Sequence, residues 1–328
     1  KNILRNIIKD KSLIDKYPLL KSMNKKYQYS YPKKKIKFFN RFSEFNLVGI
    51  GGSILGAETI YNFLKHKIKK KFNFYNNLNF QNIPITNKKN INIVISKSGN
   101  TLETISNFNL LLQKQNKNKN IILCEDKKNF LRSLGKKIKA EIFEHKNYIG
   151  GRYSVLSEVG MLPAELMGLN EKKFKRFNYL INNNNFLNEL IKNVSAILKF
   201  VKEKKFNSII LNYDKNSENL FKWYQQLVAE SLGKKSKGIM PIVSTMPKDN
   251  HSMMQLYLDG PKNNFYTFFD VIENKKNKIG SNKLILESHK YLKNKTLYQI
   301  KSAQKEATQI VFDKKNIPYR SFNLLNRS

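Results

Sequence analysis

The sequence is poor in several features that would each indicate a particular class of protein. It has one cysteine in 328 residues, Cys124, so no disulfide can form within the chain. Cys124 ends the apolar run IILC, which is typical of a buried strand, and we expect it to pack rather than react. No run of about 18 apolar residues occurs, which predicts no transmembrane helix. The first twenty residues carry charges throughout and lack the apolar core of a signal peptide, so we expect a cytoplasmic protein without a membrane partner.

Acidic residues are also scarce. The chain has 24 Asp and Glu against 61 Lys and Arg, and its formal net charge is +37. Such an excess is typical of proteins that bind nucleic acid or another anionic surface. However, the lysines are spread along the whole chain among asparagines and isoleucines, as in KNKNKNIIL, which favours a coding bias toward A/T-rich codons over a dedicated nucleic-acid face. Under either explanation, the positive field would attract a phosphorylated small molecule.

A glycine-rich turn follows the first strand-like segment. Residues 45–50 form an apolar run, Gly49, Gly51 and Gly52 allow a tight turn, and Ser53 is suited to cap the amphipathic helix that follows. A turn that leads into a helix presents free backbone N–H groups to an anion. The glycine spacing differs from the GxGxxG pattern, so the segment does not predict dinucleotide binding.

A second strand, INIVI, is followed by a segment rich in hydroxyls. Ser96, Lys97, Ser98 and Thr101 occur within six residues and lead into a helix. Hydroxyls and backbone amides donate hydrogen bonds to a phosphomonoester, and a lysine adds charge. The alternative is a helix-capping box that uses a hydroxyl and Glu103. A cap needs only one hydroxyl, so the segment favours phosphate binding.

Arg152 follows the glycine pair Gly150 and Gly151 in the segment NYIGGRYSVLSEVG. Glycines let the backbone pass close to another group, which would deliver the Arg152 guanidinium into a pocket beside an oxyanion. The alternative is a simple turn before a helix, with Arg152 in a surface salt bridge. The local sequence leaves both interpretations open.

A helical segment in the second half carries a carboxylate and an amide on one face. Gln226 and Glu230 are four residues apart, and this helix is expected to end at Gly233. A later polar segment brings His251. A carboxylate base, an amide and an imidazole suit proton transfer on a small molecule. The alternative is a solvated helix face without a catalytic role.

The order of elements predicts two α/β domains. A strand, a turn suited to phosphate and a helix recur in both halves, which is typical of doubly wound domains with parallel sheets flanked by helices. The composition becomes more polar near INNNNF. We therefore expect a helix and connector over residues 1–40, a first domain over 41–178 and a second over 179–328 that ends in helices. The strand ends of both halves would then meet at one cleft.

Five segments together are similar to the glucose-6-phosphate isomerase family, which is built from two sugar-isomerase (SIS) domains. They are GIGGSILG at 49–56, SKSGNTLET at 96–104, GGRYSVLSEVG at 150–160, QLVAESLGK at 226–234 and NHSMMQLYLDGP at 250–261. They occur in the order found in the family. The resemblance implies two SIS domains and the interconversion of glucose 6-phosphate and fructose 6-phosphate, in glycolysis and gluconeogenesis.

The resemblance also implies roles for individual residues. Glu230 would be the base that moves a proton between C2 and C1 through a cis-enediol, Arg152 would stabilise the enediol charge, and Gln226 would orient the substrate or the base. His251 would assist ring opening from the neighbouring subunit of a homodimer. Lys305, with Lys301 as the alternative, would be the ring-opening lysine. The sugar and its 6-phosphate would be held by Gly52, Ser53, Ser96, Lys97, Ser98 and Thr101.

The implied reaction needs no metal and no redox cofactor, and His66, His145 and His289 are too scattered in the sequence to indicate a metal site. The chain also departs from the family: it is short, its carboxy-terminal signature is not recognisable, and Glu158 replaces a small residue. Two other functions are considered. One is another SIS-domain isomerase that acts on a different phosphosugar. The other is a non-catalytic sugar-phosphate sensor or nucleic-acid binder, although we expect no specific nucleic-acid partner.

Overall fold

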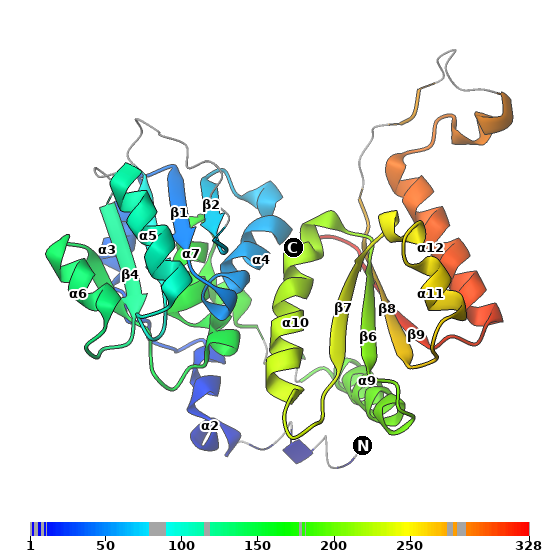
Figure 1. Ribbon diagram of the computed structural model, residues 1–328, viewed down its shortest axis with the longest axis horizontal. Helices are drawn as coiled ribbons and strands as arrows, with labels where there is room; N and C mark the ends of the chain where they lie inside the picture. Colours follow the sequence, from blue (N-terminus) through cyan, green and yellow to red (C-terminus); the bar gives the residue numbers. More distant parts are fainter. Residues whose placement is uncertain are drawn as a thin grey trace. The chain divides into compact units, whose positions relative to one another are not determined.

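The computed structural model describes residues 12–78, 90–114, 119–176, 179–180, 182–273, 278–280 and 287–327, together with residues 2, 6, 7 and 10. The chain divides into two compact units, Lys1–Ala196 and Ile197–Ser328, and each is described by itself (Figure 1). This division falls inside helix α9 (Asn184–Lys202). None of the helices in the described ranges is long and apolar enough to cross a membrane.

Unit 1 is built on a parallel sheet of five strands in the order β2-β1-β3-β4-β5. The strands are β1 (Glu44–Val48), β2 (Lys71–Tyr75), β3 (Ile91–Ile95), β4 (Lys119–Cys124) and β5 (Glu141–Glu144). Both faces of this sheet are apolar. Leu47 and Ile93 belong to one buried cluster, whereas their neighbours Val48 and Val94 belong to another on the opposite face. Cys124 is buried at the end of β4, as predicted.

Helices cover both faces of the sheet in unit 1. Residues from α3 (Lys33–Phe39), α4 (Leu55–Phe63) and α7 (Glu158–Leu166) join the first cluster. Residues from α5 (Leu102–Lys114) and α6 (Phe130–Lys137) join the second. The amino-terminal segment contains the short helix α2 (Leu13–Lys16) and the 3₁₀-helix η1 (Pro18–Met23). The expected connector up to residue 40 therefore ends in a helix, α3.

A ladder of asparagine side chains crosses this sheet. The Asn73 amide donates to Asn46 Oδ1 (3.0 Å), Asn46 donates to Asn92 Oδ1 (2.9 Å), and Asn92 donates to Asn120 Oδ1 (2.9 Å). The four residues are direct register partners on β2, β1, β3 and β4. Because buried amides must be hydrogen-bonded, this ladder disfavours any other strand register.

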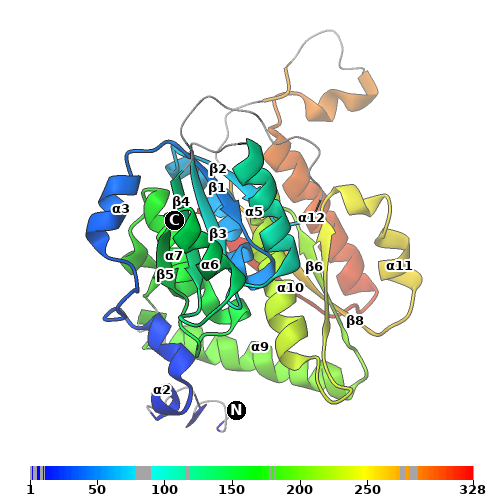
Figure 2. The same ribbon diagram turned by 60° about the vertical axis from the view of Figure 1, so that its left-hand side comes forward.

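Unit 2 has a parallel sheet of four strands in the order β7-β6-β8-β9. Its strands are β6 (Asn207–Asn212), β7 (Met240–Thr245), β8 (Asn264–Val271) and β9 (Tyr319–Leu324). Helices α11 (Met254–Asp259) and α12 (Leu297–Lys314) lie on the same face, where Tyr257 and Phe312 pack with Phe268 (Figures 1 and 2). Helix α10 (Glu218–Leu232) packs beside β7.

The predicted fold class is confirmed: both units are α/β, with parallel sheets flanked by helices. One local prediction is wrong. Ser53 does not cap a helix, because it lies in the 3₁₀-helix η2 (Gly51–Ser53) and α4 begins only after Ile54. A final strand, β9, was not expected after the last helix; its sequence YRSFNL alternates polar and apolar residues too weakly to indicate a strand.

Candidate active site

The predicted site residues fall into two sets, one in each unit. In unit 1, Ser96 directly follows β3, at the carboxyl edge of the parallel sheet. Ligands of doubly wound sheets bind at this edge. Helix α5 begins at Leu102, so the loop between them carries all four residues predicted to hold phosphate.

The hydroxyls of this loop lie close together. Ser96 Oγ and Thr101 Oγ1 share a hydrogen bond of 2.8 Å, and Ser96 Oγ also accepts from the Gly99 N–H at 3.1 Å. Gly99 has a φ of +67°, and a Cβ added there would lie 2.0 Å from Asn129 Oδ1, so the tight loop requires glycine. Ser98 is exposed and Thr101 half-buried. The loop therefore offers hydroxyls beside a helix amino terminus.

The Lys97 side chain contacts two other loops of unit 1. Its ammonium donates to the Asn147 carbonyl at 2.6 Å and lies 3.7 Å from the Glu125 carboxylate. Asn147 belongs to the loop between β5 and the 3₁₀-helix η4 (Gly151–Leu156). The Lys97 side chain thus connects the hydroxyl loop to the loop that leads to Arg152.

The two glycine turns of unit 1 are in backbone contact. A Cβ added to Gly52 would lie 2.2 Å from the Gly151 carbonyl carbon and 2.6 Å from the Arg152 backbone nitrogen. The Ser154 hydroxyl donates to Gly151 O at 2.6 Å and lies 3.1 Å from Gly52 O, which fastens η2 to η4. Gly52, Ser53 and Arg152 are therefore brought together, although they are far apart in sequence. The Arg152 guanidinium lies 4.6 Å from the centre of the Tyr153 ring.

His145 lies close to Lys97 of the candidate site, and the sequence did not indicate it. It follows β5, is buried, and its Nε2 has no hydrogen-bond partner among the described residues. Burial lowers the pKa of His145, and the nearby Lys97 ammonium lowers it further. Its position beside Lys97 and Glu125 depends on three distant segments, so no sequence spacing could have indicated it.

In unit 2, α10 presents Gln226 and Glu230 as predicted. The Gln226 amide donates to Glu230 Oε2 at 3.2 Å, and Glu230 is exposed in the last turn of the helix. Gln226 Oε1 is buried and has no hydrogen-bond partner in the described part of the chain. The Gln226 amide thus holds one carboxylate oxygen of Glu230, while the Glu230 side chain stays open to solvent.

His251 is exposed directly after the 3₁₀-helix η7 (Lys248–Asn250). The turn that carries it is organised by Asp249, whose carboxylate accepts from the Ser244 hydroxyl (2.8 Å), the Thr245 N–H (2.8 Å) and the Ser252 hydroxyl (3.1 Å). Asp249 was not predicted. Its three hydrogen bonds fix the backbone on both sides of His251.

The sequence model of the family described as Phosphoglucose isomerase matches residues 33–326. The chain belongs to this family. The glucose-6-phosphate isomerase of Methanocaldococcus jannaschii is 32% identical over 71% of this chain and 61% of its own length. That of Mycoplasmopsis pulmonis is 34% identical over 80% of this chain and 67% of its own length. The chain therefore spans about two thirds or less of these relatives.

Solved structures share the fold of this phosphoglucose isomerase family member. A hypothetical protein from Thermus thermophilus aligns with a TM-score of 0.80 and 21% identity, and the alignment covers 100% of this chain and 84% of that one. A glucose-6-phosphate isomerase from Chlamydia trachomatis aligns with a TM-score of 0.65 and 19% identity, over 99% and 69% of the two chains.

The two candidate lysines near the carboxy terminus share one carboxylate. Lys301 donates to Asp270 Oδ1 (2.7 Å) and to the Tyr213 carbonyl (2.7 Å), whereas Lys305 donates to Asp270 Oδ2 (3.3 Å) and Asn323 Oδ1 (2.8 Å). Their side chains are 18% and 7% exposed, and that of Asp270 is 2% exposed. Lys301 is the more accessible of the two. Lys305 is held more deeply, where its ammonium secures β8 and β9 to α12.

Glu158, the departure from the family at the start of α7, is fully buried and hydrogen-bonded. It accepts from the Tyr27 hydroxyl at 3.0 Å to each oxygen and from the Ser30 N–H at 3.1 Å. The buried Lys175 ammonium lies 4.6 Å and 4.4 Å from the ring centres of Tyr27 and Tyr29. Burial raises the pKa of the Glu158 carboxyl. The residue is thus a structural group that anchors the amino-terminal segment.

Lys175→Met is expected to change how stability depends on pH. Burial lowers the pKa of the Lys175 ammonium to about 8 from an ordinary value of 10.5. Between these pH values the unfolded chain binds more protons than the folded one, so this group makes wild-type stability rise with pH. The stability of Lys175→Met relative to wild type should therefore fall by about 1–2 kcal/mol between pH 7 and pH 10.

Urea unfolding of both proteins at each pH measures this difference, because titrating groups distant from Lys175 contribute equally to both proteins and cancel. The exposed neighbour Lys173→Met serves as the control and should give a difference that does not vary with pH. A constant difference for Lys175→Met would show that the ammonium is not perturbed in the folded state.

Among the described residues, no group of three or more His, Cys, Asp or Glu side chains is arranged to hold a metal ion.

Proposed function

We propose that this protein interconverts glucose 6-phosphate and fructose 6-phosphate by moving a proton between C1 and C2. The observation that carries the proposal is the Gln226–Glu230 pair, an exposed carboxylate held by a partly buried amide on one helix, in a chain of the phosphoglucose isomerase family. Relatives at 32% and 34% identity are named glucose-6-phosphate isomerase.

Glu230 acts as the base in this mechanism. With fructose 6-phosphate, its carboxylate takes a proton from C1. The electron pair of the broken C–H bond forms the C1=C2 bond, and the π pair of the C2 carbonyl moves onto O2, which takes up a proton to give the cis-enediol. The O1 hydroxyl then loses its proton as the C1 carbonyl forms, and the carboxylate returns its proton to C2, so no atom is gained or lost overall. A carbon-bound proton beside a carbonyl is weakly acidic, and a positioned carboxylate is the kind of group that removes it. The Gln226 amide keeps the carboxylate in place.

Arg152 stabilises the negative charge that develops on the enediol oxygens. Its guanidinium remains charged at any physiological pH, and a preorganised cation is most effective where charge forms in the transition state. Support for this role comes from the contact of Gly52 and Gly151, which fixes the turn that carries Arg152.

The 6-phosphate is held by the loop between β3 and α5. Ser96, Ser98 and Thr101 supply hydroxyls at the start of a helix, where backbone N–H groups also favour an anion. Gly52 and Ser53 contact the sugar. Lys97 contributes charge near the phosphate, and its bond to Asn147 links the occupied loop to the turn before Arg152.

Ring opening is assigned to His251 and to one lysine of α12. Lys305 is the predicted lysine, and the greater exposure of Lys301 makes it the alternative. We further propose that the protein acts as a homodimer in which His251 serves the neighbouring subunit. The exposure of His251, together with the three hydrogen bonds that order its turn, supports this assignment.

The direct test is an assay of the purified protein with fructose 6-phosphate. We expect glucose 6-phosphate to form, detected by coupling to its NADP-dependent oxidation, and the reverse reaction to proceed to the same equilibrium ratio. Ketose phosphates of other chain length serve as competing substrates. If one of these compounds were converted faster than fructose 6-phosphate, it would replace fructose 6-phosphate as the proposed substrate. If neither fructose 6-phosphate nor any of these compounds were converted, the isomerase function would be contradicted.

A further inference from the structure

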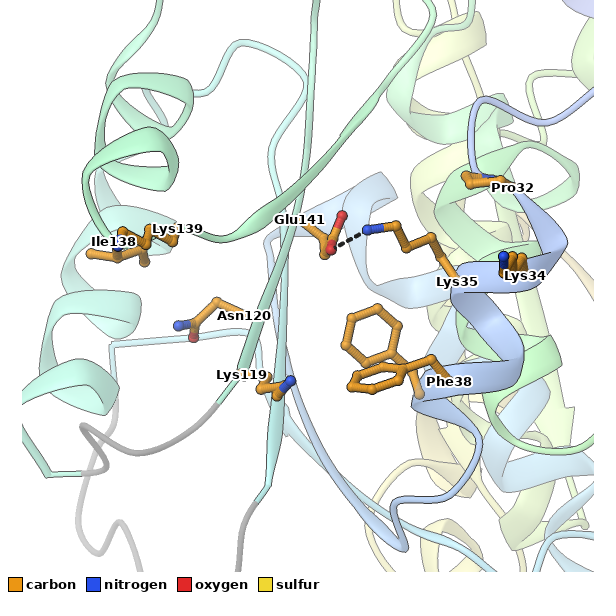
Figure 3. Close-up of a pocket in the computed structure, with 10 residues that line it drawn as sticks. Pro32, Lys34, Lys35, Phe38, Lys119, Asn120, Ile138, Lys139 and Glu141 are labelled. Atoms are coloured by element: carbon orange, nitrogen blue, oxygen red, sulfur yellow. Dashed lines mark hydrogen bonds and ion pairs between the residues drawn. The ribbon is translucent and has the colours of Figure 1, made fainter.

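A hollow in unit 1 lies away from the hydroxyl loop. Its volume is about 640 Å³, and it is formed by α3 and the first residues of β4 and β5 (Figure 3). Because the sheet is parallel, the first residues of its strands lie at the edge opposite to the one where Ser96 follows β3. The hollow is therefore separate from the candidate active site.

Four lysines and one carboxylate line this hollow: Lys34, Lys35, Lys119, Lys139 and Glu141. Lys35 reaches across to Glu141, with 2.5 Å between the ammonium nitrogen and the carboxylate oxygen (Figure 3). The other three lysines have no carboxylate partner among the described residues. Three such lysines along one hollow make it locally positive, and a multiply charged anion neutralises this charge.

The rest of the lining is apolar, apart from Asn120. Pro32, Phe38, Phe39 and Ile138 contribute apolar surface. Phe38 is half-buried, and the Lys119 ammonium lies 4.4 Å from the centre of its ring. Asn120 is the last member of the asparagine ladder, so its side chain is held in a fixed orientation at the hollow. The hollow thus combines a cationic rim with an apolar, aromatic wall.

We propose that this hollow binds a nucleoside di- or triphosphate. Two or three phosphates match three lysines that lack a carboxylate partner, and a flat base matches the aromatic ring of Phe38, over which the Lys119 ammonium now lies. The volume is within the range of about 300–1,000 Å³ that is typical of small-molecule sites. A hollow of this size suits a small molecule better than a nucleic-acid strand, which needs an open track along the surface.

The test is calorimetric titration of the full-length protein with ATP at low and physiological salt. We expect saturable binding of one ATP per chain that weakens as salt rises, because the contacts are ionic. Lys119→Gln and Lys139→Gln should each lower the affinity on the order of tenfold, the usual effect of losing one charge-assisted hydrogen bond. Isomerase activity should be unchanged in both variants.

Lys37→Gln is the matched control. Lys37 is an exposed lysine on the same helix α3 and does not line the hollow, so its loss should change the affinity less than twofold. An equal loss of affinity in Lys37→Gln would show diffuse attraction by the +37 net charge and would overturn the proposal. Absence of saturable ATP binding would overturn it as well.

Two further ligands distinguish the source of the affinity. Tripolyphosphate carries the phosphate charges of ATP without a base. Phe38→Leu should therefore weaken the binding of ATP and leave the binding of tripolyphosphate unchanged. A single-stranded oligonucleotide that displaces ATP and binds more tightly would assign the surface to nucleic acid and contradict the proposal.

Discussion

Glu230→Gln is expected to slow isomerisation by about 100- to 10,000-fold, the range typical of losing a general base. The amide has nearly the shape of the carboxylate but cannot take a proton from carbon. Glu230 is exposed near the end of α10, so the substitution should leave the fold and the affinity for substrate nearly unchanged. The loss should therefore appear in kcat and not in KM.

Steady-state kinetics of purified Glu230→Gln, with circular dichroism to verify folding, measure this effect. Glu218→Gln is the matched control, because Glu218 is an exposed glutamate in the first turn of the same helix. It should keep wild-type kcat. If Glu230→Gln retained more than about a tenth of wild-type kcat, another group would have to be the base.

Gly52→Ala is expected to have the second-largest effect. The added methyl group would lie 2.2 Å and 2.3 Å from the Gly151 carbonyl carbon and oxygen, distances at which backbone atoms must move. The displaced turn is the one that carries Arg152. We expect a loss of about 3 kcal/mol in the free energy of unfolding and a kcat at least about 100-fold lower.

Gly150→Ala tests whether the turn rejects any added methyl group or only one that meets the contact between Gly52 and Gly151. Gly150 is two residues from Arg152, has a φ of −69°, and an added Cβ would meet only Tyr153 Cδ2, at an ordinary 3.5 Å. This variant should be much closer to wild type in both stability and kcat. Equal effects of the two substitutions would show that the contact between Gly52 and Gly151 does not position Arg152.

The sequence predicted the features that depend on local spacing. The four-residue separation of Gln226 and Glu230 placed both side chains on one helix face, where the structure joins them by a hydrogen bond. The continuous apolar run INIVI predicted a buried strand, and β3 is buried along its whole length. Both features depend only on neighbouring residues in the chain.

Features that depend on distant parts of the chain were not predicted. The contact of Gly52 with Gly151 joins segments about a hundred residues apart in sequence, and the asparagine ladder exists only once four strands are in register. The sequence singled out Glu158 but not Tyr27, Ser30 and Lys175, which surround it. Ser53 had good capping chemistry, yet the two glycines before it favour a 3₁₀ turn and delay the helix.

Proton transfer through an enediol is the central claim, and isotope incorporation tests it most directly. Fructose 6-phosphate is incubated with the protein in deuterium oxide, and the glucose 6-phosphate formed is analysed at C2. Because the proton passes through the Glu230 carboxylate, which exchanges with solvent, we predict deuterium at C2 of the product. Glucose 6-phosphate with no deuterium at C2 even after many reversible turnovers, in which slow exchange at the carboxylate would have accumulated, would indicate direct hydride transfer between the carbons and would contradict the role of Glu230.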